Sequence, residues 1–169
     1  MKTSPDNFIV LKSIGIIHTP YTSDAPNQST ENSEGEFKIV LNKDLSEGLY
    51  RLEAFNYIYV LYYLDKVIRK NEMHVAPPMK HSGKVGLFAS RSPNRPNPIG
   101  ISVVKIKEIS GNTIYISGID AFNNTPVLDI KPYFDELDAK EDANTGWFNP
   151  KDDPDHFLLH LKGIPHQHK

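Results

Sequence analysis

The segment at residues 88–100, with the sequence FASRSPNRPNPIG, most constrains what this chain can fold into. Each of its three prolines fixes φ near about −65° and removes a backbone N–H donor. Each proline also biases the residue before it toward extended conformations. The segment therefore cannot form a helix and is a poor candidate for a central strand. We predict a stiff, irregular arm that carries Arg91 and Arg95.

The two arginines of this arm have two possible roles. Guanidinium groups held on a rigid loop between apolar runs suit the binding of an anion or a planar ligand. The alternative is a structural proline loop whose arginines are merely solvated. Both interpretations stay open on these residues alone, because a motif is a hypothesis until its context is known.

Length and composition describe an ordinary soluble protein. The chain has 169 residues, of which 38% are hydrophobic and 24% charged, enough for one domain with a real core. We expect a single domain over 1–169, with its core at about 8–135 and an acidic extension at 136–169. No apolar run is long enough to span a bilayer, and the N-terminus lacks the apolar stretch of a secretion signal. We therefore expect no membrane association and a cytoplasmic protein.

Charge is distributed unevenly along the chain. Residues 66–107 hold nine Lys or Arg and one acid, Glu72, a net charge of +8, so the remainder carries −10. A basic middle in an acidic protein is typical of contact with a polyanion. The alternative is that these basic residues do not cluster in space.

Short apolar runs separated by turn residues predict a β-rich fold. The expected strands lie at residues 8–17, 37–41, 57–64, 101–109, 113–119 and 126–130, the third of them buried on both faces. Asp44 could cap a short helix that reaches residue 55, with Glu47 in the capping-box position. Residues 22–35 are polar and predict a long loop. This pattern favours a mostly β barrel or sandwich, and no G-x-G-x-x-G motif indicates a Rossmann fold.

A second informative segment spans residues 118–133 (GIDAFNNTPVLDIKPY). Asn123 and Asn124 indicate a turn that tolerates positive φ. The backbone amides of such a turn, with its Asn and Thr side chains, could read the edge of a nucleobase; an ordinary hairpin is the alternative.

The chain also offers little for a metal. It has no cysteine, which excludes disulfides, thiolate catalysis and cysteine zinc sites. His156 and His160 have helical spacing but lack the glutamate of a zinc-protease helix, so we expect no metal site.

Four stretches resemble the TrmO family, also called the TsaA-like or YaeB-like family. They are residues 14–21 (IGIIHTPY), 52–55 (LEAF), 85–100 (VGLFASRSPNRPNPIG) and 125–133 (TPVLDIKPY). The resemblance implies a mostly β, TsaA-like β-barrel outside the Rossmann fold, with short helices and long loops. It also implies a homodimer that binds S-adenosylmethionine and methylates N6 of N6-threonylcarbamoyladenosine beside the tRNA anticodon.

The resemblance further implies which residues form the sites. The positions that match the family's cofactor contacts are Asn27, Gln28, Ser29, Asp65, Lys66, Arg91, Ile101, Phe122, Asn123, Asn124 and Thr125. We expect Lys80, Lys84 and Arg95 to meet tRNA phosphates, with a structural role as the alternative for Arg95. The catalytic base is not identified: Asp129 and Tyr133 are candidates by sequence position, and a buried structural role is the alternative for both.

The chain departs from the family at two of these sites. It has Phe-Asn-Asn-Thr at 122–125 where a Leu-Asp-Gly-Thr type of sequence is common, and Asp65-Lys66 where a His-Gln type of pair is common. We expect no counterpart here of the second domain of the longer bacterial members. Two alternatives therefore stay open: an S-adenosylmethionine-dependent methyltransferase with another small molecule or nucleic acid as acceptor, and a non-catalytic S-adenosylmethionine-binding or interaction module.

Overall fold

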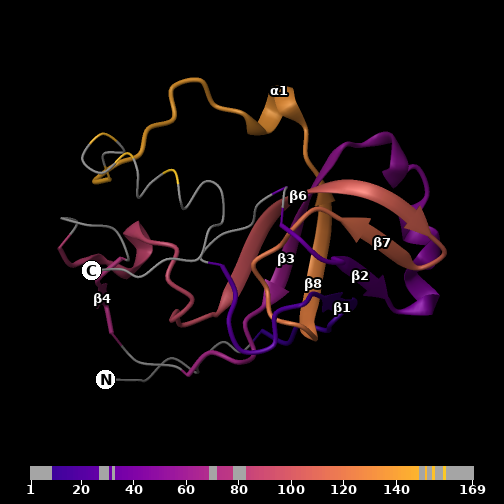
Figure 1. The fold of residues 1–169 in the computed structure, drawn as a ribbon, viewed down its shortest axis with the longest axis horizontal. Coiled ribbons are helices and arrows are strands. Elements are labelled where there is room, and N and C mark those ends of the chain that lie inside the picture. Colours follow the sequence, from indigo (N-terminus) through magenta and orange to yellow (C-terminus); the bar gives the residue numbers. More distant parts are fainter. Residues whose placement is uncertain are drawn as a thin grey trace, which may run out of the picture.

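The computed structural model describes residues 9–26, 31, 33–68, 72–77, 83–148, 151, 154 and 158. Its main body is a closed barrel with the strand order β1-β2-β7-β6-β3-β8, all neighbours antiparallel (Figure 1). The strands are β1 (Gly15–His18), β2 (Lys38–Leu41), β3 (Tyr57–Tyr63), β6 (Ile99–Ser110), β7 (Thr113–Ile116) and β8 (Thr125–Pro132). The predicted mostly β barrel is confirmed.

The core lies inside the barrel and is built from alternate residues of each strand. In β3, Ile58, Val60 and Tyr62 are buried, while the residues between them are only partly buried. Successive side chains of a strand point to opposite faces, and a barrel has a single interior. The expectation that this strand is buried on both faces is therefore wrong.

The first barrel strand is shorter than its composition suggests. Only Gly15–His18 pairs with β2 and β8, although the β-branched run was expected to form a strand from residue 8. Ile9 and Val10 are 84% and 88% exposed, and residues 9–13 lie outside the core, while Ile14 packs against it. Propensity favours a strand from residue 8, but only Ile14 continues the backbone bonding of β1: its N–H donates to Val127 O and its carbonyl accepts from Asn42 N, both at 2.9 Å.

The predicted helix after β2 forms two 3-10 helices instead. They are η1 (Lys43–Leu49) and η2 (Leu52–Ala54), and they are separated at Arg51, whose φ is 66°. Neither has a side-chain cap; Asp44 lies inside the first turn of η1, so the predicted capping box is wrong. A left-handed residue interrupts helical geometry, which explains why one helix does not continue to residue 55.

The arm lies beside the barrel and is joined to it at one end. The strands β4 (His74–Val75) and β5 (Val85–Gly86) pair outside the barrel, and η3 (Leu87–Ala89) leads into the irregular part of the arm (Figure 1). The arm ends where β6 begins, because Ile99 and Gly100 are already paired with β3. Leu64 N donates to Pro98 O at 2.8 Å, which joins the end of the arm to the chain after β3.

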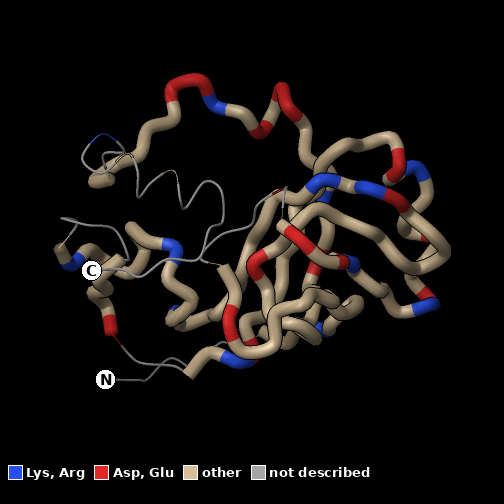
Figure 2. The backbone as a smooth tube through the Cα atoms, viewed as in Figure 1, with Lys and Arg blue, Asp and Glu red and all other residues tan. Residues whose placement is uncertain are grey.

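The chain after β8 returns to the arm. It forms α1 (Asp135–Asp138) and then arches across to the far side of the structure, with its acidic residues drawn red in Figure 2. There Trp147 Nε1 donates to Ala89 O at 2.7 Å. The acidic segment therefore contacts the proline arm. The apolar piece predicted at 157–161 lies outside the described residues apart from Leu158. Among the residues described, no helix has the length and apolar character to cross a membrane.

Candidate functional site

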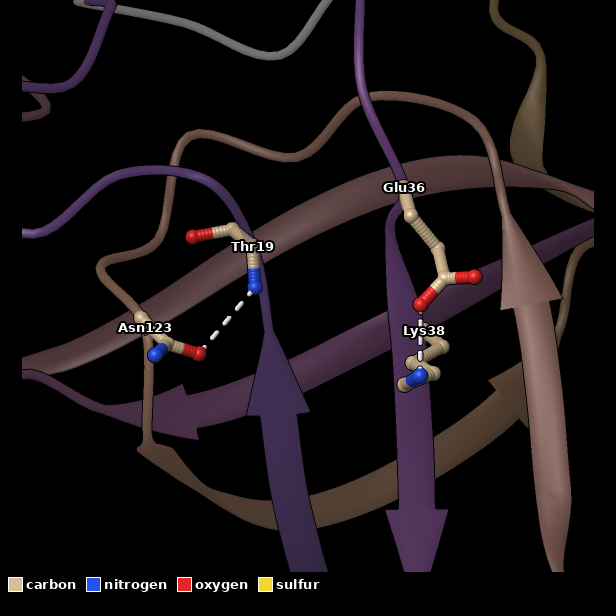
Figure 3. A network of polar contacts seen from close by, with 4 residues as sticks. All are labelled: Thr19, Glu36, Lys38 and Asn123. Carbon is tan, nitrogen blue, oxygen red and sulfur yellow. Dashed lines mark hydrogen bonds and ion pairs between the residues drawn. The ribbon is translucent and has the colours of Figure 1, made fainter.

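The turn between β7 and β8 is anchored to the end of β1. Thr19 is 8% exposed, and its Oγ1 donates to Ala121 O at 3.0 Å. Its backbone N–H donates to Asn123 Oδ1 at 3.3 Å (Figure 3). One residue after β1 therefore holds both the approach to the turn and the side chain at its tip.

The backbone amides of this turn are used inside the protein. Asn123 N donates to Tyr21 O at 2.7 Å, and Asn124 N donates to Ile17 O at 2.9 Å. Thr125 N donates to Phe122 O at 3.2 Å. These three amides are therefore not free to read a nucleobase, which favours the ordinary hairpin given as the alternative. Asn124 does adopt the predicted positive φ, at 67°, and its exposed side chain remains on the surface of the turn.

The predicted pair after β3 lies against this turn. Lys66 Nζ donates to Asn123 O at 3.0 Å and lies 5.3 Å from the centre of the Phe122 ring. Lys66 is exposed, and a cation–π contact at an exposed site contributes roughly 0.5–1 kcal/mol. Asp65 is exposed, and its carboxylate makes no hydrogen bond or ion pair with another described residue. The structure thus brings two of the predicted cofactor segments together.

The two arginines of the arm differ in their contacts. Arg95 Nη1 donates to Ser90 O at 2.9 Å and lies 3.3 Å from Ser92 O. Its guanidinium lies 5.7 Å from the Phe88 ring. Arg95 therefore contacts other residues of the arm and stabilises its conformation. Arg91 is exposed and forms no hydrogen bond or ion pair within the described part of the chain. The structure therefore favours a structural role for Arg95 and leaves Arg91 available to a ligand.

Some predicted contacts cannot be placed. Asn27, Gln28, Ser29 and Lys80 lie outside the described residues, as do His156 and His160. Lys84 is exposed on the chain before β5. The described residues contain no group of three or more His, Asp or Glu able to hold a metal ion.

Ile101 and Asp129 lie in one row on the outside of the barrel. Leu61 of β3 pairs with Ile101 on one side and with Asp129 on the other. Two strand spacings separate them, about 10 Å. Asp129 Oδ1 accepts from Ile130 N at 2.9 Å, and Oδ2 forms an ion pair with Lys131 Nζ at 2.8 Å. Its side chain is 45% exposed, so the candidate base is neither buried nor unpartnered.

Tyr133 belongs to an aromatic cluster farther along the barrel. Its ring centre lies 5.5 Å from that of Tyr59 and 6.5 Å from that of Tyr57. Tyr57 pairs with Lys105, four residues from Ile101 and so about 13 Å along β6. Desolvation, followed by the charge of Asp138, raises the pKa of Tyr59. Tyr133 therefore packs within the cluster rather than beside the turn.

A polar cluster that was not predicted from the sequence lies next to the turn, and two of its three members are buried. Tyr62 Oη lies 3.0 Å from Ser102 Oγ and 3.1 Å from Asp120 Oδ1, and Ser102 Oγ donates to Asp120 Oδ1 at 2.9 Å. Tyr62 is 3% exposed and Ser102 is 7% exposed. The signal was present in the alternation of both strands, since it places these two polar residues inward, where they need partners.

Comparison with known proteins assigns the family. The model of the tRNA-methyltransferase O N-terminal domain matches residues 16–139. The chain belongs to this family. A crystal structure of TrmO is similar, with 31% sequence identity and a TM-score of 0.71, covering 85% of this chain and 66% of the other. TrmO from Pseudomonas aeruginosa gives a TM-score of 0.69 at 29% identity, over 85% of this chain and 64% of that one.

Two curated relatives of the TrmO-family chain carry different names. A protein of Pyrococcus abyssi, named a probable S-adenosyl-L-methionine-binding protein, is 40% identical over 82% of this chain and 76% of its own length. The tRNA (adenine(37)-N6)-methyltransferase of Rattus norvegicus is 35% identical over 69% of this chain. The chain spans only 28% of the rat protein.

Proposed function

We propose that this TrmO-family domain binds S-adenosylmethionine and methylates N6 of an adenine in tRNA. We further propose N6-threonylcarbamoyladenosine beside the anticodon as the acceptor. The observation that carries the proposal is the contact between Lys66 and the turn at 122–125, in which Lys66 Nζ donates to Asn123 O at 3.0 Å. Relatives named for S-adenosylmethionine binding and for tRNA adenine-N6 methylation support it.

The residues around the contact between Lys66 and the turn suit a charged nucleoside cofactor. The exposed Asp65 carboxylate can accept hydrogen bonds from ribose hydroxyls, since an ionised carboxylate is acceptor-only. The Phe122 ring and the Asn124 side chain offer a flat face and an amide for an adenine edge. Arg91 has no side-chain partner among the described residues, so its guanidinium can bind a carboxylate through two parallel bonds.

When bound, S-adenosylmethionine would supply an electrophilic methyl group, and its sulfur would leave as the thioether of S-adenosylhomocysteine when the methyl–sulfur bond breaks. The task of the protein is to hold the acceptor nitrogen in line with that methyl, roughly 3–3.5 Å away. The carbamoyl substituent makes the N6 proton more acidic. A base would accept that proton as the new bond to N6 forms. Asp129 is the candidate nearer to Ile101, and a general base contributes roughly 10²–10⁴-fold.

We also propose a homodimer and a tRNA surface. The outer face of β6 exposes Ile99, Ile101 and Val103 by 39%, 59% and 43%. An apolar face that includes a proposed cofactor contact suits a two-fold interface with a second copy of the chain. Lys84 and Lys80 remain the proposed phosphate contacts, and a tRNA substrate fits the expected cytoplasmic location.

The direct test is mass spectrometry of tRNA nucleosides. A strain lacking the gene should lose the N6-methylated form of threonylcarbamoyladenosine and regain it with the wild-type gene. Purified protein with S-adenosylmethionine should then methylate tRNA from the deletion strain. An unchanged nucleoside profile in the deletion strain would refute the tRNA function.

A second candidate is an S-adenosylmethionine-binding module, or a methyltransferase with another acceptor. The chain spans 94% of an S-adenosyl-L-methionine-binding protein of Archaeoglobus fulgidus at 38% identity, but only 28% of the rat methyltransferase. Cofactor binding without methylation of tRNA would favour this candidate. A methyl-transfer assay on a panel of metabolites then separates a different acceptor from a non-catalytic module.

A further inference from the structure

We propose that Tyr62, Ser102 and Asp120 form a positioning network that fixes the shape of the cofactor site from inside the barrel. The role rests on the proposed function, because the site it shapes is the proposed cofactor site. The three side chains come from β3, β6 and the chain between β7 and β8. Their oxygens lie within 2.9–3.1 Å of one another.

The hydrogen atoms of the cluster determine its bonding pattern. Tyr62 and Ser102 carry one hydroxyl hydrogen each, while Asp120 as a carboxylate only accepts. Both hydroxyls can therefore donate to Asp120 Oδ1. The 3.0 Å contact between Tyr62 Oη and Ser102 Oγ then has no hydrogen left to form a hydrogen bond. Bonds to a charged acceptor are the stronger ones. Burial and the Asp120 charge raise the pKa of Tyr62, so its phenol remains a donor.

Each member lies close in sequence to a proposed cofactor contact. Ser102 follows Ile101, and Asp120 precedes Phe122 by two residues. Tyr62 precedes Asp65 by three residues, and between them Leu64 N is bonded to Pro98 O. The partly buried Asp120 carboxylate thus couples three separate segments of the site. A loss of its donors would let these segments move relative to one another.

Gly100 connects this network to the proline arm. It pairs with Tyr62 across β3 and β6, and a Cβ built on it would lie 2.2 Å from Cε2 of the Tyr62 ring. The ring therefore occupies the space above the glycine backbone, an aromatic residue covering a strand glycine. The glycine that closes the arm is required for Tyr62 to reach Asp120.

Thr19 holds the other side of the turn at 122–125 without contacts from the network. Thr19 bonds Ala121 O and the Asn123 side chain, at 3.0 Å and 3.3 Å. Removing a donor from the network should therefore loosen one side of the turn without releasing it. The expected consequence is weaker cofactor binding in a protein that still folds.

The test compares Tyr62→Phe and Asp120→Asn with the control Ser117→Ala. Ser117 is 2% exposed, and its Oγ accepts from Lys105 N at 2.9 Å, so the control removes an equally buried hydroxyl. Calorimetry should show that both network variants weaken S-adenosylmethionine binding roughly tenfold, about 1.4 kcal/mol. The control should change it less than about twofold, although all three lower Tm. In a methyl-transfer assay the network variants should raise KM for the cofactor more than they lower kcat.

The outcomes separate this inference from the proposed function. If the wild type binds the cofactor and Tyr62→Phe binds it as tightly as Ser117→Ala, the positioning role is refuted. If the wild type does not bind, the proposed function fails. In that case hydrogen exchange tests whether the network holds the turn in place. The amides of Asn123 and Asn124 should exchange faster in Tyr62→Phe than in Ser117→Ala. Equal exchange in the two variants would overturn it. Asp120→Asn supplies the same comparisons if Tyr62→Phe does not fold.

Discussion

The replacement Gly100→Ala tests the packing beneath the proposed site. The added Cβ would lie 2.2 Å from Cε2, 2.5 Å from Cζ and 2.8 Å from Cδ2 of the Tyr62 ring. Overpacking a core costs roughly 1–3 kcal/mol, and Tyr62 is both buried and tethered through its hydroxyl. We therefore expect the upper end, about 3 kcal/mol. At roughly 2–4 °C per kcal/mol for a domain of this size, Tm falls by about 6–12 °C.

The assay is thermal unfolding with a matched control and a rescue. Gly48→Ala adds the same methyl in η1, where nothing lies within 4 Å of it, so Tm should not fall. In a Tyr62→Leu background the ring is absent, and Gly100→Ala should then cost less than about 1 kcal/mol. An equal loss of stability in both backgrounds would refute the packing argument.

The other predictions concern the turn, the acidic segment and the buried phenol. Lys66→Met should weaken S-adenosylmethionine binding a few-fold by calorimetry, with Tm nearly unchanged because the side chain is exposed; unchanged affinity would contradict it. Trp147→Phe removes the donor to Ala89 O, and limited proteolysis should cut the segment after β8 faster; an unaltered rate would count against this anchor. The pKa of Tyr62 is raised by burial and by Asp120, so above about pH 10 the unfolded phenol ionises first and stability falls. Urea unfolding at pH 9 and pH 11 should therefore show a smaller loss in Tyr62→Phe than in the wild type, and equal losses would be inconsistent with a buried neutral phenol.

The barrel could be predicted because short apolar runs are separated by turn residues, as at the turn around Gly111 between β6 and β7. The inward alternation of Ile58 and Val60 could not, because the residues between them are apolar as well. The first strand was predicted too long, since β-branched residues raise strand propensity wherever they occur. Pairing decides the outcome: the ladders with β2 and β8 include Gly15–His18, and Ile14 adds one backbone bond on each side.

The site was predictable as segments but not as contacts. The family resemblance implied that Asp65-Lys66 and the turn at 122–125 belong to one site, and Lys66 does contact Asn123. No sequence pattern shows that the turn's amides bond to Tyr21 and Ile17, because those partners are about a hundred residues away. The role of Gly100 is hidden for the same reason, as it depends on the strand register opposite Tyr62.

Calorimetric titration of the wild-type protein with S-adenosylmethionine tests the central claim most directly. The account predicts saturable binding of one cofactor per chain, weakened by Asp65→Ala, whose exposed carboxylate is a proposed contact. The absence of binding at millimolar cofactor by a folded protein would contradict it.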